Sequence, residues 1–173
     1  MAYMWASCSF TYYMIAIYVK YIPGSIYTNS IASGSSEVAA YILAGVIYGK
    51  LGVRYTFQSF YTLSVIGGVC ILFLGEKLAE SSWMPFFVIL AKFGVSGGFN
   101  LVYVSSVDVF PTLFQGSALG FCNFFARFLT IFAPQVAERP PPLPMILFTG
   151  LCLLGIFLVH FVRTLKEQEL LNK

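Results

Sequence analysis

Four charged side chains lie inside apolar segments of this 173-residue sequence, where a charge is costly unless a cavity, a partner or a pathway accommodates it. Arg127 lies in the middle of the apolar run 124–129, and Lys92 lies about half-way along another run. Both are too deep to reach a membrane surface easily, so we expect them to serve a solute-binding function; the alternative for Arg127 is a structural ion pair. Glu37 and Lys20 lie nearer the ends of their runs, where reaching an interface or pairing with each other explains them.

Two buried cations without enough carboxylates on the same helices predict a positively charged cavity, which attracts an organic anion rather than a cation. Tyr12, Tyr13, Phe99 and Tyr103 are candidates for its walls, because apolar walls with a few hydroxyl groups are typical of small-molecule sites. Each of these aromatic residues taken singly is more often explained by ordinary packing or lipid contact.

Enzymatic and cofactor chemistry is not indicated. The sequence has no Ser/His/Asp set, no paired carboxylates and no phosphate-binding glycine-rich loop, so we expect a protein that is not an enzyme and has no cofactor. Its four cysteines lie far apart without a Cys-x-x-Cys pair, which argues against a metal or redox site and favours packing as small hydrophobes. We assign a packing or interface role to His160, the only histidine.

The overall composition places the chain in a lipid bilayer. Hydrophobic residues make up 58% of the sequence and charged residues only 10%, against about 45–50% and about 25% in soluble domains. That balance excludes most soluble globular and disordered classes. The ten Lys and Arg residues are scattered and the net charge is only +3, so we expect no nucleic-acid partner.

Charges, prolines and glycines divide the sequence into six apolar runs, each close to the roughly 20 residues that cross a bilayer. We therefore predict an all-α membrane protein with one six-helix domain over 1–173 and a cytoplasmic tail at 163–173. The predicted transmembrane helices cover residues 5–22, 31–48, 55–74, 83–107, 116–136 and 144–162.

The distribution of basic residues predicts the orientation. An even number of spans places both termini on one side, and the connections on that side carry more Lys and Arg, including Lys50 and Arg54, than those on the other. This excess favours cytoplasmic termini. Trp5 and Trp83 begin the first and fourth predicted spans, as interfacial aromatic residues often do.

Pairs of glycines four residues apart predict close helix packing. They are Gly45 with Gly49 and Gly116 with Gly120, and the fourth predicted span adds a small-residue patch at 94–98.

Several short motifs occur in order along nearly the whole chain, and together they resemble the organic anion and cation transporters of the major facilitator superfamily. Each motif is weak alone. The stretch 91–100 (AKFGVSGGFN) and the turn 108–112 (DVFPT) are similar to the tenth helix and the loop after it, and 120–122 (GFC), 126–127 (AR) and 133–134 (AP) are similar to the eleventh helix. The segments 10–13 (FTYY) and 24–27 (GSIY) are similar to the seventh helix and the following loop. The segment 49–54 (GKLGVR) is similar to the turn between the eighth and ninth helices.

The resemblance implies a fold and partners. The chain is similar to the C-terminal six-helix half of such a transporter, built as two inverted three-helix repeats, with the first half missing. The implied partners are the lipid bilayer, a small organic solute, and a second six-helix half or a larger membrane assembly. The plasma membrane is the first expectation for its location and an organelle membrane the second.

The resemblance also implies roles for individual residues. Arg127 matches the position where anion-transporting members carry Arg and cation-transporting members carry Asp. Lys92 matches a tenth-helix lysine, and Phe99 and the pair Tyr12–Tyr13 match aromatic positions of the substrate pocket.

Lys50, Arg54 and Asp108 match inner-face gating motifs, which hold helices together in one conformational state. The gating ion-pair networks are expected to be thinned, because three positions depart from the motifs. They are Gly49, Val53 and Gln115.

These observations predict a transporter, or the C-terminal half of one, for small organic ions, with anions preferred, working by alternating access. The substrate is expected along the first, fourth and fifth spans. The alternative is a non-transporting half-transporter retained as a structural subunit of a larger membrane complex. A six-helix channel is less favoured, because no selectivity-filter-like segment occurs.

Overall fold

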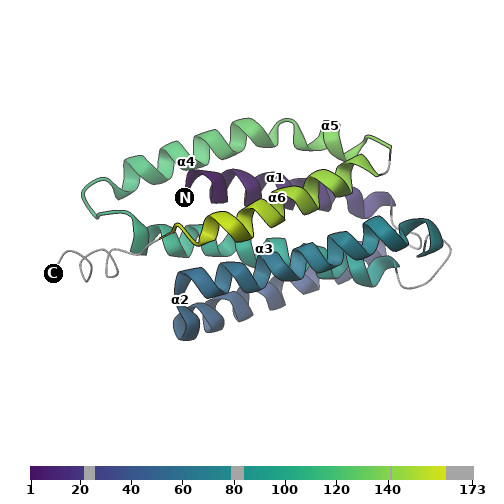
Figure 1. Cartoon of the computed structure of the whole chain (residues 1–173), viewed down its shortest axis with the longest axis horizontal. Coiled ribbons are helices and arrows are strands. Elements are labelled where there is room, and N and C mark those ends of the chain that lie inside the picture. The colour runs from purple at the N-terminus through teal and green to yellow at the C-terminus, as the bar shows by residue number, and fades with distance from the viewer. Residues whose placement is uncertain (22–25, 79–83, 141, 163–173) are drawn as a thin grey trace.

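The computed structural model describes residues 1–21, 26–78, 84–140 and 142–162, and every regular element in these ranges is helical. The prediction of an all-α chain is thus confirmed for this part of the protein. The helices run side by side along the long axis of the molecule (Figure 1). They are α1 (Ala2–Tyr18), the short 3-10 helix η1 (Val19–Tyr21), α2 (Ile26–Leu78), α3 (Met84–Val109), α4 (Gln115–Thr130), α5 (Ala133–Ala137) and α6 (Leu143–Val159).

Helix α2 is divided into two arms at Gly52. Its 53 residues would extend about 80 Å if straight, more than twice the thickness of a bilayer core. Gly52 has φ 74° and ψ −178°, a conformation that glycine adopts without a steric penalty. Figure 1 shows α2 doubling back, so that the arms 26–51 and 53–78 lie alongside each other. The break falls inside the turn that the sequence predicts at 49–54.

Within the described residues, three helical stretches are long and apolar enough to cross a membrane by length and composition: Ser30–Phe73, which contains the break at Gly52, Pro85–Val109, and Gln115–Ala137, which combines α4 and α5. Leu143–Val159 is a shorter apolar helix. The arrangement of six spans therefore stays a prediction. Trp83 and the predicted tail at 163–173 lie outside the described residues.

The predicted fifth span, 116–136, is divided between α4 and α5. The helix stops at Thr130 and a new one starts at Ala133, with Pro134 in its first turn. Proline lacks the N–H that a continuing helix needs, but it fits the first turn of a new one.

Glycines of α3 allow close contact with the second arm of α2. A methyl group at Gly94 would lie 2.5 Å from the backbone oxygen of Phe60, and one at Gly97 would overlap the Phe60 ring. The expectation of small-residue packing at 94–98 is therefore confirmed. Within the described part of the chain the same expectation is not met for the two spaced pairs. Gly45 and Gly120, like their partners, are exposed, and no described atom beyond their own helix lies within 4 Å of the methyl position. Their faces point away from the other described helices.

Replacing Gly94 by Ala is expected to destabilise the bundle by about 1–3 kcal/mol, because the new methyl group forces α3 away from α2. Thermal unfolding in detergent measures the effect. Gly120→Ala is the control, because its methyl group meets open space and the midpoint should stay the same or rise slightly, since alanine favours a helix more than glycine does. Equal midpoints for the two variants would contradict the packing of α3 on α2.

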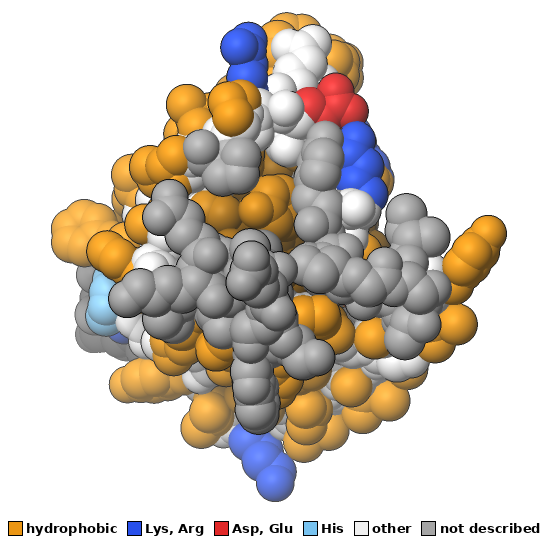
Figure 2. Space-filling view, turned by 90° about the vertical axis from the view of Figure 1, so that its right-hand side faces the viewer, with side chains coloured by type: hydrophobic (Ala, Val, Ile, Leu, Met, Phe, Trp, Pro, Cys, Tyr) orange, Lys and Arg blue, Asp and Glu red, His pale blue; other side chains and the backbone are white. Residues whose placement is uncertain are grey.

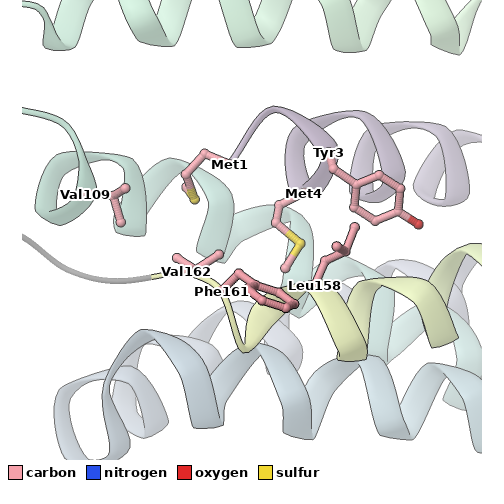
Figure 3. A pocket seen from close by; sticks show the side chains of 7 residues that line it. All are labelled: Met1, Tyr3, Met4, Val109, Leu158, Phe161 and Val162. Carbon is pink, nitrogen blue, oxygen red and sulfur yellow. The ribbon is translucent and has the colours of Figure 1, made fainter.

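The two ends of the described chain lie at the same end of the bundle. Met1 and Val162 both line a cavity of about 370 Å³ (Figure 3). The other lining residues come from α1, α3 and the end of α6 and are largely apolar: Tyr3, Met4, Val109, Leu158 and Phe161. Figure 2 looks at the opposite end, where hydrophobic side chains dominate the described surface in view and the few charged ones lie near the margin.

Three of the four cysteines, Cys8, Cys122 and Cys152, are buried, and all four are free, as expected for small packing residues. Cys8 lies 3.0 Å from the Tyr61 hydroxyl. His160 is exposed at the end of α6, where its Nε2 lies 2.9 Å from Nε2 of Gln58.

Candidate substrate site

The four aromatic residues expected to line a pocket come together between α1 and α3. The Tyr12 and Phe99 rings are stacked with centroids 5.0 Å apart. Phe99 meets Tyr103 edge-on at 5.5 Å, and Tyr12 meets Tyr13 edge-on at 5.3 Å. Phe99 and Tyr103 share one face of α3, because residues four apart are neighbours on a helix surface.

Trp5 extends this aromatic cluster toward the inside of the bundle. Its ring lies 4.4 Å from that of Tyr103, and its Nε1–H donates to Oγ of Ser106 at 3.1 Å. Only 1% of Trp5 is exposed. The expectation that Trp5 lies at a membrane interface is therefore wrong: its indole N–H finds a partner within the bundle, so the whole side chain can be buried.

Lys92 is held in a buried polar contact between α3 and the first arm of α2. Its Nζ lies 2.6 Å from Oε1 of Glu37 and donates to Oγ of Ser33 at 2.5 Å. The Tyr12 hydroxyl donates to the same carboxylate, 3.2 Å from each oxygen. Because Ser33 and Glu37 are four residues apart, one helix face presents both to Lys92.

This contact corrects the expectation that Glu37 pairs with Lys20 or reaches an interface. Glu37 is bound by Lys92, and Lys20 pairs with Glu138 at 2.9 Å on the exposed surface. On the described residues of their own helices, Lys92 and Arg127 have no carboxylate partner. The compensating carboxylate comes from a different helix, and the site is therefore less positive than expected.

Arg127 projects from α4 toward α1. Its Nη1 donates to the Tyr13 hydroxyl at 2.5 Å, and its Cζ lies 5.5 Å from the centre of that ring. Its Nε donates to Oδ1 of Asn123, one turn earlier, at 3.3 Å. Among the described residues no carboxylate forms an ion pair with Arg127, so the structural ion pair considered for it is not found there.

The surroundings of Arg127 are open. Only Cys122 and Ala126 of α4 are buried, and the side chain of Arg127 itself is exposed. The guanidinium group is therefore both accessible and fixed in position by neutral hydrogen-bond acceptors, Tyr13, Asn123 and Tyr103.

The three residues of the implied gating motifs lie at the end of the bundle that contains Met1 and Val162. Asp108 accepts a hydrogen bond from the hydroxyl of Tyr48, and Arg54 donates to the backbone oxygen of Val162 at 3.4 Å. Lys50 is exposed. Within the described ranges, Lys50 and Arg54 form no ion pair with Asp108.

Three participants, Ser33, Asn123 and Trp5, were not expected at the site. Asn123 carries a signal in the sequence, because it precedes Arg127 by one helical turn. A role for Ser33 can be inferred only when the structure shows that Glu37 lies beside Lys92. No sequence pattern distinguishes Trp5 from an interfacial tryptophan.

No family model matches this sequence. It is similar to solute carrier family 22 member 15 of Xenopus tropicalis, with 30% identity over 144 residues, covering 79% of this chain and 27% of the relative. It is 28% identical over 163 residues to organic cation/carnitine transporter 2 of Homo sapiens, covering 92% of this chain and 29% of that protein. Solute carrier family 22 member 4 of Mus musculus is also 28% identical over 163 residues.

The chain thus spans less than a third of the length of these relatives. They are transporters, and the similarity extends over most of the chain. Homologues of the chain are therefore members of the solute carrier family 22, organic cation/carnitine transporter 2 among them, within the major facilitator superfamily.

Proposed function

We propose that this chain is part of a membrane transporter for small organic ions that works by alternating access and prefers anions. The observation that carries the proposal is the Arg127 guanidinium, exposed and without a carboxylate partner among the described residues. It lies against Tyr13, beside the stack of Tyr12 on Phe99.

The chemistry of the site suits an aromatic anion. The anionic group accepts hydrogen bonds from Arg127, and such charge-assisted bonds are the stronger kind. The apolar part of the solute lies against Tyr12, Phe99 and Tyr103. Lys92 also lies near Tyr12, with its Nζ 6.0 Å from the ring centre, but its ammonium group is paired with Glu37. One of the relatives named above, organic cation/carnitine transporter 2, carries cation and carnitine in its name, so the preference for anions rests on Arg127.

The same residue supports a partner. An arginine exposed on an apolar helix is costly in lipid, and a second six-helix half facing α4 would enclose it in a water-filled cavity. The chain would then supply six spans of the bilayer with both termini in the cytoplasm. Lys50, Arg54 and Asp108 would act at the inner face as the halves rock against each other.

The second candidate is a non-transporting scaffold within a larger membrane complex. It is favoured by the state of the gating residues, since Lys50, Arg54 and Asp108 form no ion pairs with one another in the described part of the chain.

One experiment separates the two candidates. Vesicles from cells that express the full chain are tested for uptake of radiolabelled benzenesulfonate, and the chain is purified from the same membranes. A transporter gives uptake above that of control vesicles, with a six-helix partner co-purifying. A scaffold gives stoichiometric co-purification with a complex and no uptake.

A further inference from the structure

We propose that Glu37 sets the charge number of the solute that the site accepts. Because Glu37 neutralises the charge of Lys92, Arg127 is the cation that binds the charged group of the solute. A singly charged organic anion is therefore preferred to a dianion. This inference rests on the proposed function of the same site.

The geometry around Lys92 directs its ammonium group toward Glu37 rather than toward a solute. Lys92 is 7% exposed, and two of the three donors of its ammonium group are occupied by Glu37 and Ser33. The Glu37 carboxylate in turn accepts a hydrogen bond from the Tyr12 hydroxyl group. The carboxylate is therefore held from two helices, and moving it away would leave a buried cation without a counter-ion, which is strongly unfavourable.

Tyr12 connects the neutral pair to the open part of the site. Nζ of Lys92 lies 6.0 Å from the centre of the Tyr12 ring, and the centre of the Tyr13 ring lies 5.3 Å from it. Cζ of Arg127 in turn lies 5.5 Å from the centre of the Tyr13 ring. A solute that lies against Tyr12 and Tyr13 is close to both charged groups. At such separations in a partly buried site, one added or removed charge changes the affinity for an ion by about tenfold or more.

The charge of this pair can be changed in both directions. Glu37→Gln leaves Lys92 charged and makes the pair +1, whereas Lys92→Met leaves Glu37 charged and makes it −1. The double variant Glu37→Gln/Lys92→Met is neutral, as is the wild type. A role in which Lys92 binds the solute directly predicts instead that the double variant loses affinity.

The test is calorimetric binding to the purified full chain of three ligands that share one ring and carry permanent charges: benzenesulfonate, 1,4-benzenedisulfonate and phenyltrimethylammonium. The wild type is expected to bind the monosulfonate most tightly. Glu37→Gln should raise the affinity for the disulfonate relative to the monosulfonate about tenfold or more. Lys92→Met should lower that ratio and strengthen binding of the cation, and the double variant should restore the wild-type order.

Each outcome decides. If the wild type binds the monosulfonate but the ratio is unchanged in both single variants, the role of Glu37 is overturned and the proposed function stands. If the wild type binds none of the three ligands, both fail. If the single variants do not fold, the double variant is the test. A double variant with the wild-type affinity for the monosulfonate and the wild-type ratio of disulfonate to monosulfonate affinity supports the proposal. A double variant that binds the monosulfonate more weakly than the wild type overturns it.

Discussion

Replacing Arg127 by Gln is expected to weaken benzenesulfonate binding about 10- to 100-fold without loss of the fold. Hydrogen bonds to a charged group contribute about 1.5–3 kcal/mol, and about 1.4 kcal/mol corresponds to tenfold in affinity. Stability should change little, because Arg127 is exposed and its described hydrogen-bond partners, Tyr13, Asn123 and Tyr103, are neutral groups. Calorimetric titration and the thermal midpoint in detergent measure the two effects.

The matched control is Arg139→Gln, which removes the same charge from an exposed position before α6. Binding should be unaffected there. Similar losses in both variants would mean that Arg127 acts only through the overall charge of the protein.

Removing Lys92 is expected to have the largest effect on stability. Lys92→Met leaves the Glu37 carboxylate without its partner in a largely buried place, at a cost of about 3 kcal/mol in the free energy of unfolding. Adding Glu37→Gln should recover most of that loss, because it removes the unpaired charge. Thermal unfolding of the single and double variants measures both steps.

An exposed ion pair provides the comparison. Lys20 and Glu138 are 42% and 59% exposed at their side chains, so Lys20→Met should cost only about 0–1 kcal/mol. If Lys92→Met proves no more damaging than Lys20→Met, the pairing of Lys92 with Glu37 between α3 and α2 is wrong.

The sequence predicts the helical class and a turn at 49–54, within which α2 breaks at Gly52, because both depend on local composition. It also names the aromatic residues that meet, Tyr12, Tyr13, Phe99 and Tyr103, from their types and from the resemblance to a transporter substrate pocket.

What the sequence does not predict depends on contacts between helices. The pairing of Glu37 with Lys92 depends on how the first arm of α2 lies against α3, and nothing in either segment alone specifies it. Gly45 and Gly120 belong to motifs typical of packed interfaces, yet their faces are open. Trp5 has the position of an interfacial residue, but Ser106 provides a partner for its indole N–H inside the bundle.

The site combines contributions from four helical segments. Helix α1 provides Tyr12 and Tyr13, the first arm of α2 provides Glu37, α3 provides Lys92, and α4 provides Arg127. In the proposed mechanism these helices would move together as one half against the second half, so that the site would be exposed to each side of the membrane in turn without being rebuilt.

The most direct test of this account is the ratio of benzenesulfonate uptake to phenyltrimethylammonium uptake, measured in the same vesicles for the wild type and for Arg127→Asp. The account predicts a ratio above one for the wild type and an inverted ratio for Arg127→Asp, because the charge that reads the solute changes sign. The same ratio in both proteins would contradict the assignment of Arg127 to the substrate site.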